Sequence, residues 1–533
     1  MKTDSTFWQG QNRGAWLGIF GILALFVVLR WNNYDVPLTR DEGGFAYSAQ
    51  LLVQGLAPYE HAFEQKPPLV IYSYALSNLL LPQFFWSARL LAFLFVAVAT
   101  ALLGYIARLE FGRGYALPAM WLMTPMVLLP DIEQYWASVE MFMLLPMLGT
   151  VAIYCYSRQH GHDPKHWFWA AFLAVTTLLY KYTALPVLAL TFAVWFAEMC
   201  LKGPGRSFIG RCLAFAVAGA AVATVVEIGY FVAHDGGKQF WECTVQFNRS
   251  YVGSGIFGPD KLAAQFKFFW KNWWILFLIP WAGLLLKNRR VWFWVGMFGC
   301  AIVATGMSGY GQYYITIMPF WALLGVLGIR ALALRFNFVP NMSAWCGSLL
   351  VAVVVFLIVR PDIPWLSCTR EQFVEVKMAR YPFIESLGMA ERVAQLSSPD
   401  DFVFIAGSEP QILCYAHRFS PTRFVTIYPL MIPGPLARQC QMEVIRDLQK
   451  HPPKLIIFVI NGTSWTRHDA TPMDFFHFLS GFLRQNYEMT GGYVADDPYS
   501  HWSQLQTSEE FTNASMVLYT RKTLKLNTPS AER

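Results

Sequence analysis

The residues best suited to chemistry lie in one polar stretch, residues 40–69, which reads RDEGGFAYSAQLLVQGLAPYEHAFEQKPPL. It contains the adjacent acids Asp41 and Glu42, then Tyr47, and it closes on Lys66 before two prolines. A carboxylate near apolar surface can have its pKa raised, which makes it competent as a general base. A lysine held at a membrane face is what a lipid-linked phosphate needs. We interpret this stretch as a reaction site at the bilayer surface; a solvated loop and a lysine reaching to headgroups are the alternatives.

Three more charged residues stand at the ends of apolar segments, namely Arg89, Glu140 and Lys181. Charges at such positions are costly, so they are functional candidates by default. Arg89 and Lys181 lie on the side where topology gives no reason for a cation. Glu227 lies deep in an apolar segment, where it either pairs with a buried cation or has another role.

The composition is that of a membrane protein with attached extramembrane mass. Of its 533 residues, 55% are apolar and only 14% are charged, whereas soluble proteins carry about 25% charged residues. The formal net charge is +7. Its Lys and Arg residues are better explained as topology signals than as a nucleic-acid footprint, so we expect no nucleic-acid partner.

Apolar segments long enough to cross a bilayer predict about eleven transmembrane helices. They lie near residues 14–31, 89–107, 115–130, 139–156, 167–181, 183–200, 210–233, 271–287, 291–307, 313–330 and 343–360. The apolar segment 69–81 is shorter and predicts a re-entrant or interfacial helix.

The distribution of basic residues orients these segments. With the N-terminus in the cytoplasm, the inside turns carry Arg108/Arg113, Arg158/Lys165, Lys202/Arg206/Arg211, Lys287/Arg289/Arg290 and Arg330/Arg335. This agrees with the positive-inside rule. No small-x-small cleavage site follows residues 14–31, so we interpret them as a retained first helix. An odd number of spans places the C-terminal segment outside, on the same side as the long loops 32–88 and 234–270.

The chain therefore divides into a transmembrane domain, residues 1–360, and an outer α/β domain, residues 361–522, followed by a tail, 523–533, that we expect to be disordered. Strand and helix patterns alternate after residue 361, which indicates a largely parallel sheet. The strands are expected at 400–406, 423–428 and 454–460, and the helices at 408–417, 436–450 and 471–487. Gly407-Ser408 is a weak candidate for a phosphate turn, since neither GxGxxG nor a P-loop is present. Docking onto the membrane part, or shaping the acceptor entrance, is the expected role of this domain.

The nine cysteines form no CxxC pair and no zinc-like cluster. Cys414 and Cys440 lie in the segment expected outside, where a disulfide is permitted, and are the first pair to test.

Several motifs together resemble GT-C glycosyltransferases, in the branch of dolichyl-phosphate-mannose–protein mannosyltransferases and bacterial aminoarabinose transferases. The motifs are the acid pair with Tyr47, Gly55-x-x-Pro58-Tyr59, Lys66-Pro67-Pro68-Leu69, Ser87-Ala88-Arg89-Leu90, Ser138-x-Glu140-x-Phe142-Met143, Lys181-x-Thr183-Ala184 and Gln312-Tyr313-Tyr314 through Pro319. The resemblance covers most of residues 14–360. Some members of the family also carry an α/β domain after the last helix.

This resemblance implies an enzyme of the inner membrane that uses a polyprenyl-phosphate sugar donor at its periplasmic or lumenal face, with a glycan, lipid or protein as acceptor. It implies the following roles: Asp41 as general base, Glu42 and Glu140 orienting acceptor or sugar, Lys66, Arg89 and Lys181 binding the lipid phosphate, and Tyr47, Gln312, Tyr313 and Tyr314 lining the donor cavity. Gln312 stands where relatives often have His or Arg. Some relatives bind a divalent metal near the acids, which makes the surroundings of Asp41 a candidate metal position.

Displacement of a lipid phosphate at an anomeric carbon needs an activated nucleophile and cations that stabilise the leaving group, and a single displacement inverts the anomeric centre. A transporter or flippase for a lipid or glycan is the main alternative, although the chain shows no internal repeat. An outer-domain sensor and an oligosaccharyltransferase are further alternatives. The sugar and the acceptor are not determined by the sequence.

Overall fold

A computed structural model of the chain describes residues 15–130, 133–203, 205–234, 236–252, 259–286, 288–305, 310–336, 342–378, 380–494 and 500–522. The chain forms two compact units. The helical unit consists of Met1–Val36, Lys66–Asp235 and Gly255–Phe373, and the α/β unit of Pro37–Gln65, Gly236–Ser254 and Val374–Arg533. Most of the polar stretch 40–69 and part of the loop 234–270 thus fold with the C-terminal segment. The predicted disordered tail lies outside the described residues.

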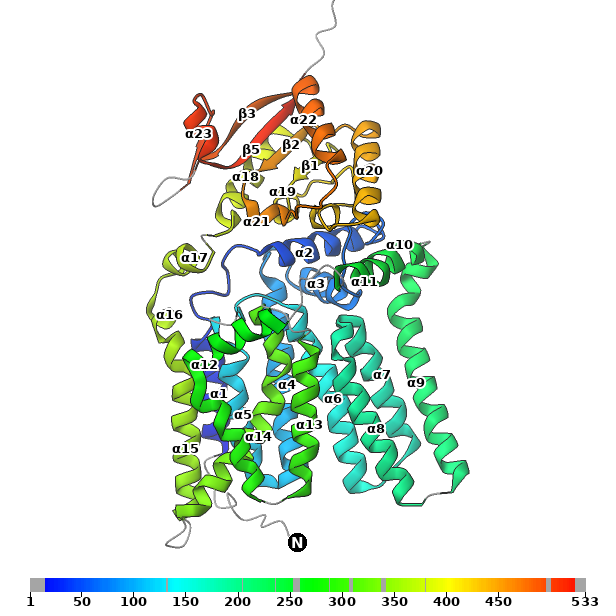
Figure 1. Cartoon of the computed structure of the whole chain (residues 1–533), viewed down its shortest axis with the longest axis vertical. Helices are drawn as coiled ribbons and strands as arrows, with labels where there is room; N and C mark the ends of the chain where they lie inside the picture. Colours follow the sequence, from blue (N-terminus) through cyan, green and yellow to red (C-terminus); the bar gives the residue numbers. More distant parts are fainter. Residues whose placement is uncertain are drawn as a thin grey trace, which may run out of the picture. The chain divides into compact units, whose positions relative to one another are not determined.

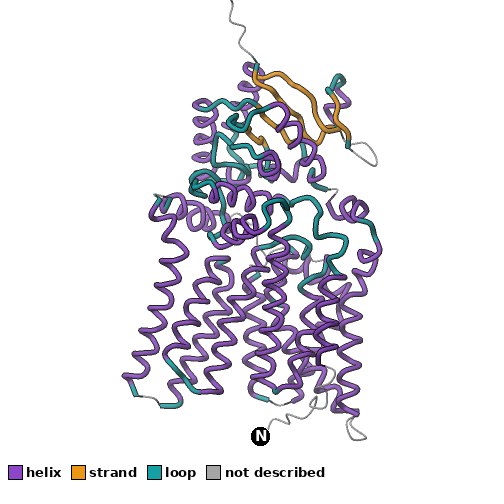
Figure 2. Tube along the Cα trace, turned by 180° about the vertical axis from the view of Figure 1, so that it is seen from behind, coloured by secondary structure: helices purple, strands orange, loops and turns teal. Residues whose placement is uncertain are grey.

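The helical unit contains long helices that run side by side, seen in Figures 1 and 2. The helices of this unit, long and short, are α1 (Ala15–Val28), α3 (Leu69–Leu80), α4 (Ser87–Phe111), α5 (Ala116–Met126), α6 (Val139–His160), α7 (Pro164–Tyr180), α8 (Leu185–Leu201), α9 (Arg206–Ala233), α12 (Pro259–Ala282), α13 (Arg289–Ala304), α14 (Met318–Ala333), α15 (Met342–Val359) and α16 (Ile363–Ser367). Short turns of other helix types complete it: η1 (Arg113–Tyr115), η3 (Tyr182–Ala184), η5 (Gly283–Leu286), η6 (Gly311–Thr316), η7 (Leu334–Phe336) and η8 (Arg360–Asp362). A helix overlaps every span predicted from the sequence.

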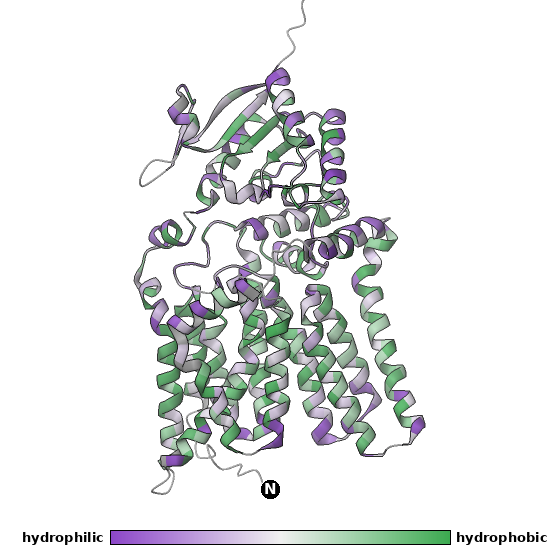
Figure 3. Ribbon diagram, viewed as in Figure 1, coloured by the Kyte–Doolittle hydropathy of each residue, from purple (hydrophilic) through white to green (hydrophobic). Residues whose placement is uncertain are grey.

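The long helices of this unit are mostly apolar, as the hydropathy colouring of Figure 3 shows. Within the described part of the chain, five are long and apolar enough to cross a membrane: Ser87–Phe111, Val139–His160, Tyr182–Leu201, Arg206–Ala233 and Ala344–Ser367. Crossing by the shorter helices remains a prediction. The segment expected to be re-entrant or interfacial is the short apolar helix α3.

Helices α7 and α9 approach so closely that a side chain at Gly219 of α9 would collide with the backbone of Phe168 of α7. Small residues at such contacts let membrane helices pack by dispersion. At the same interface Thr176 Oγ1 donates a hydrogen bond to Glu227 Oε1 at 2.7 Å. Among the described residues no cation pairs with Glu227. Its partner there is the hydroxyl of Thr176, whereas the sequence analysis had offered a buried cation as one possibility.

The α/β unit combines the C-terminal segment with two insertions from earlier in the chain. Its elements are α2 (Arg40–Val53), α10 (Gly237–Trp241), η4 (Glu242–Gln246), α11 (Phe247–Val252), α18 (Phe383–Leu396), β1 (Val403–Ala406), α19 (Gln411–Ala416), η9 (Tyr428–Leu430), α20 (Pro435–Lys450), β2 (Leu455–Val459), α21 (Gly462–Trp465), α22 (Asp474–Asn486), β3 (Tyr487–Val494), β4 (His501–Ser503), α23 (Ser508–Thr512) and β5 (Ala514–Arg521). Helix α17 (Arg370–Met378) crosses the boundary between the units.

The sheet of this unit has the strand order β1-β2-β5-β3-β4 in the described residues. Strands β1 and β2 pair in parallel, with Val403 opposite Leu455, whereas the β2–β5, β5–β3 and β3–β4 pairs are antiparallel. The expectation of a largely parallel sheet is therefore wrong. The strands that change it, β3 and β5, escaped prediction because β3 contains Gly491-Gly492 and β5 carries polar residues at several positions, and both features weaken a strand pattern.

Residues 423–428 were predicted as a strand and form none. Their backbone groups bond elsewhere: the Arg423 carbonyl accepts a hydrogen bond from Phe63 N at 2.6 Å, and Ile427 N donates to Ser408 Oγ at 3.1 Å. Strand propensity is overridden where tertiary partners satisfy the backbone. The helices expected at 408–417, 436–450 and 471–487 are present as α19, α20 and α22.

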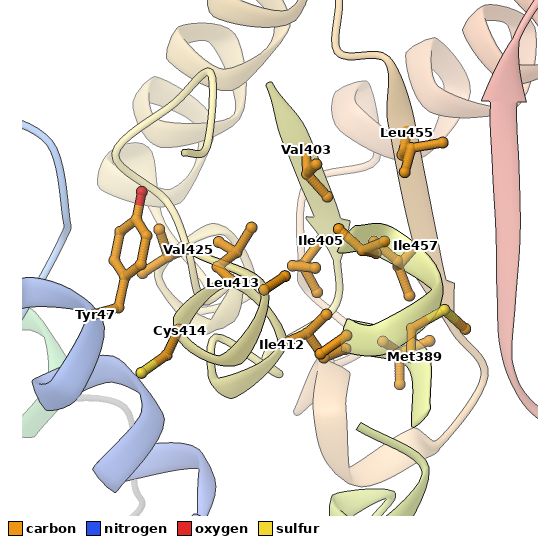
Figure 4. Close-up of a cluster of buried hydrophobic side chains, with 14 of the residues drawn as sticks. Tyr47, Met389, Val403, Ile405, Ile412, Leu413, Cys414, Val425, Leu455 and Ile457 are labelled. Atoms are coloured by element: carbon orange, nitrogen blue, oxygen red, sulfur yellow. The ribbon is translucent and has the colours of Figure 1, made fainter. Parts of the chain in front are cut away.

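Helix α2 is built into the hydrophobic core of the α/β unit. Tyr47 of α2 packs in one cluster with residues of β1, β2 and α19, among them Ile405, Ile457 and Leu413 (Figure 4). Full burial of such side chains is worth about 1.5–3 kcal/mol each. The segment that was expected to be an outer loop is therefore an integral layer of this unit.

Arg423 ties three segments of the α/β unit together. It forms ion pairs with Glu443 of α20 at 2.7 Å and with Glu242 of η4 at 3.3 Å. Burial, which alone would lower its pKa, is outweighed by these acids, so the pKa of Arg423 is raised. The second insertion, Gly236–Ser254, is thus held by charge to the C-terminal segment.

All nine cysteines are free. The Cys414–Cys440 disulfide named as the first pair to test is therefore not formed. The Cys414 thiol instead accepts a hydrogen bond from Gln50 Nε2 at 3.3 Å, and burial raises the pKa of this thiol to about 12.

Candidate active site

The acid pair begins helix α2, and its two members have opposite surroundings. Thr39 is the N-cap, and its hydroxyl accepts a hydrogen bond from Glu42 N at 3.4 Å. Glu42 Oε2 in turn accepts a hydrogen bond from Thr39 N at 3.1 Å, which completes a capping box. Glu42 is fully buried, whereas Asp41 is exposed. Of the two acids, Asp41 is therefore the one that can meet a substrate.

Asp41 shares its surroundings with Glu64 and Tyr428. Glu64 Oε2 lies 3.8 Å from the position that a Cβ on Gly44 of α2 would take. The pKa of the Tyr428 phenol is held well above its ordinary value, first by burial and then by the carboxylates of Glu64 and Asp41. Sequence reasoning missed Tyr428, because its only signal was membership of a segment predicted as a strand.

Tyr47 is a core residue of the α/β unit. It is 2% exposed, and its hydroxyl accepts a hydrogen bond from Ser420 N at 3.1 Å. Burial raises the pKa of Tyr47 to about 12. These contacts give it a structural role and do not support the expected place in a donor cavity.

In the helical unit, three of the predicted residues meet. Lys181 caps the C-terminus of α7, and its Nζ forms an ion pair with Glu140 in the first turn of α6. The same Nζ lies 3.0 Å from the centroid of the Tyr313 ring in η6. Each charge stands at the helix end whose dipole favours it, and cation–π attraction is strongest where water is excluded. We call Glu140, Lys181 and Tyr313 the charged triad.

The chain neighbours of the charged triad include buried polar atoms without a partner. Ser138 is fully buried, and its Oγ has no hydrogen-bond partner in the described part of the chain. The same is true there of Gln312 Oε1, in a residue that is 7% exposed. Tyr314 is also buried. Buried polar atoms are nearly always satisfied, so unsatisfied ones require an explanation such as a ligand or a water.

The two remaining cations differ in their accessibility. Arg89 is fully buried and donates from NH1 to the carbonyl oxygens of Tyr34 and Val36, at 3.2 and 2.7 Å. It therefore holds the chain that follows α1, which weakens the case for a phosphate contact. Lys66 is half-buried and directly precedes the prolines that lead into α3.

The predicted site residues thus divide between the units. Asp41, Glu42 and Tyr47 belong to the α/β unit, and the other predicted residues, from Lys66 to Tyr314, belong to the helical unit. No group of three or more His, Cys, Asp or Glu side chains that could hold a metal is present in the described residues. The residues around Asp41 therefore do not fit a resident metal site, and no step is assigned to one.

A scan against protein families finds no match for the chain, and a search of curated proteins finds none either. Solved structures do match. The crystal structure of ArnT, the aminoarabinose transferase of Cupriavidus metallidurans, in the apo state matches with a TM-score of 0.54 and 13% identity over 95% of this chain and 97% of that one. The same protein bound to undecaprenyl phosphate matches with a TM-score of 0.53 and 13% identity over 95% and 98% of the two chains.

The arabinofuranosyltransferase AftD from Mycobacteria matches with a TM-score of 0.51 and 11% identity, over 96% of this chain and 40% of that one. These proteins are GT-C glycosyltransferases. The chain therefore has the GT-C fold, with a helical membrane part and a small C-terminal sheet, as the sequence motifs predicted. It is an integral membrane protein.

Proposed function

We propose that this protein is a membrane glycosyltransferase that moves a sugar from a polyprenyl-phosphate donor to an acceptor hydroxyl. One observation carries the proposal: the fold matches ArnT over nearly the whole of both chains, and ArnT has been solved with undecaprenyl phosphate bound. At 13% identity this likeness concerns the fold, so the chemistry is argued from the residues below.

Asp41 is the general base in this proposal. Asp41 is exposed at the first turn of α2, most of whose other residues are buried, while its neighbour Glu42 takes part in the capping box. As base, Asp41 takes the proton from the acceptor hydroxyl as the oxygen attacks the anomeric carbon. The bond from that carbon to the phosphate oxygen breaks in the same step, which inverts the anomeric centre.

Cations stabilise the phosphate that leaves. Lys66 is the first candidate, because it is half-buried at the start of the helical unit's second segment. Lys181 is the second, although its charge is shared with Glu140 and the face of Tyr313. In this proposal the charged triad orients the sugar and its phosphate, and Ser138 Oγ and Gln312 Oε1 accept hydrogen bonds from sugar hydroxyls.

In this proposal the protein lies in an inner membrane and the reaction takes place on its periplasmic or lumenal face. The basic residues of the predicted inside turns support the orientation with a cytoplasmic N-terminus. Acceptors of protein, lipid or glycan type are all compatible with this chemistry.

The test is a transfer assay on membranes that contain the full-length protein, with radiolabelled polyprenyl-phosphate sugars of several kinds. We expect transfer by the wild type, and a loss of about 10²–10⁴-fold in Asp41→Asn, the range that a positioned base supplies. Full activity of Asp41→Asn would remove Asp41 from the role.

The variant Lys66→Ala tests whether Lys66 contributes to binding of the donor and not of the acceptor. We expect its donor KM to rise and its acceptor KM to stay within twofold, because only the donor carries the phosphate. Lys454→Met, a change of the same charge in the α/β unit, is the control. Movement of a lipid or glycan across vesicles without any transfer product would favour a transporter instead.

A further inference from the structure

Open α/β sheets bind their ligands outside the carboxyl ends of parallel strands. In this protein the parallel pair is β1 and β2. Ser408 lies in the segment that follows β1, and Thr463 lies in the short helix α21 that follows β2. Arg40 of α2 contacts both residues. We propose that this end of the sheet is a dock that positions the base-bearing helix; the inference rests on the proposed role of Asp41.

Arg40 makes three directed contacts with the dock. Its Nε donates to the Ser408 carbonyl at 2.5 Å, and its NH1 donates to the Thr463 carbonyl at 2.9 Å. Its NH2 pairs with Glu409 Oε1 at 2.5 Å, and the Glu409 side chain is fully buried. The planar guanidinium thus bridges the ends of two neighbouring strands, and such charge-assisted bonds are about twice as strong as neutral ones.

The groups that receive Arg40 are themselves held in place. Gln411 Nε2 donates to Glu409 Oε2 at 2.8 Å and to Ser386 Oγ at 3.1 Å. Ser408 N donates to Ser464 Oγ at 2.6 Å. The dock is therefore organised by its own hydrogen bonds, and the position of Glu409 is set by residues of the C-terminal segment.

The backbone of α2 also lies against the dock. A Cβ on Gly43 would stand 2.5 Å from the backbone nitrogen of Gln411. Glycine costs a helix about 1 kcal/mol relative to alanine, so close packing explains its presence here. Further along, Gln50 Nε2 donates to the Cys414 carbonyl at 3.2 Å, and before the helix Leu38 N donates to Tyr415 Oη at 2.7 Å.

Arg40 directly precedes Asp41, so these contacts restrain the backbone of the proposed base while its carboxylate stays exposed. A displacement of about 1 Å of a reacting group can cost about 10²-fold in rate. The C-terminal segment would then contribute to catalysis without touching the substrate, and Arg40 and Glu409 are positioning residues.

The experiment uses the full-length protein and the same transfer assay. The double variant Arg40→Met/Glu409→Gln removes both charges together, so no buried charge is left unpaired. Gly43→Ala displaces α2 without changing any charge. Arg40→Lys keeps the positive charge but loses the planar set of N–H donors with which the guanidinium bonds Ser408, Thr463 and Glu409. The control is Lys454→Met, which breaks the Lys454–Asp401 pair at 2.8 Å in the same unit.

We expect the double variant and Gly43→Ala to lower kcat about 10- to 100-fold, with normal stoichiometry of donor binding and unchanged donor KM. Arg40→Lys should restore part of the rate. The rise of kcat with pH that reports the base should flatten in the variants, because a displaced base contributes less to the remaining rate. A partly unfolded preparation would instead scale the whole profile and lower the binding stoichiometry.

Suppose that Asp41→Asn is inactive. Wild-type kcat and an unchanged pH profile in the double variant and in Gly43→Ala would then overturn the proposal that the dock positions the base. An equal loss in Lys454→Met would also overturn it. Full activity of Asp41→Asn, or no sugar transfer by the wild type, would instead overturn the proposed function, so the two failures are distinguishable.

Discussion

Lys181 Nζ lies 3.0 Å from the centroid of the Tyr313 ring while it pairs with the Glu140 carboxylate. A buried ion pair is weak evidence for stability, since desolvation offsets much of its attraction. Its two members come from helices α6 and α7 and meet where each helix dipole favours the charge. A buried charge pair of this kind is therefore a candidate for a functional role.

We expect the effects of substitutions at Glu140 and Lys181 on the free energy of unfolding to be strongly coupled. Glu140→Gln and Lys181→Met should each destabilise the protein by about 3–5 kcal/mol, because each removes one partner of a buried ion pair. The double variant should cost clearly less than the sum of the single variants. Thermal unfolding in detergent measures this, and additive losses would mean that the two groups do not interact.

Glu42 should behave as a capping residue. Glu42→Gln keeps the capping box, so we expect unfolding within about 0.5 kcal/mol of wild type and normal transfer. Thr39→Ala should cost about 1 kcal/mol through loss of the cap. A large fall of kcat in Glu42→Gln with normal stability would show instead that the carboxylate charge acts on the substrate.

Gln312 should contribute to binding and not to stability. Gln312→Met removes a buried oxygen that has no partner within the described residues, so stability should stay equal or rise. Loss of one hydrogen bond of about 1 kcal/mol to the donor should raise its KM about fivefold.

The matched control for Gln312 is Gln441→Met. Gln441 is fully buried and its Nε2 donates to the Leu430 and Pro472 carbonyls at 2.9 and 2.7 Å. The variant Gln441→Met should be less stable than wild type by about 1–3 kcal/mol, and its donor KM should be unchanged. An unchanged KM in Gln312→Met would leave its oxygen without a substrate role.

The lowered pKa of Asp401 predicts that the stability of the protein depends on pH under acid conditions. Hydrogen bonds from Lys454, and then from Ser398, lower the pKa of Asp401 to about 2. A depressed carboxyl pKa contributes stability above the unfolded value of about 3.9, and this contribution is lost as the pH falls through about 2. The Asp401 side chain is partly exposed and its partner Lys454 is exposed to solvent, so the effect at pH 7 should be below about 1 kcal/mol.

Asp401→Asn should therefore be less stable than wild type at pH 7, and the difference should narrow between about pH 4 and pH 2. Unfolding of the full-length protein followed across this range checks it. A difference that stays constant with pH would show that the Asp401 charge is not involved.

The sequence by itself determined the features that depend on local pattern. Hydrophobic length predicted helices such as α4 and α9, because a helix in a membrane is specified by its own apolar residues. The motifs around Asp41, Lys66 and Lys181 predicted the GT-C fold. Each of these signals is contained within a short stretch of chain.

Tertiary structure alone decided how these stretches were used. The acids Asp41 and Glu42 are adjacent in the sequence, and only the tertiary structure buries Glu42 while it leaves Asp41 exposed. Arg40 finds its partners, Ser408 and Glu409, more than 300 residues further along the chain. Contacts between distant segments depend on how the chain closes on itself, and no local pattern in the sequence encodes them.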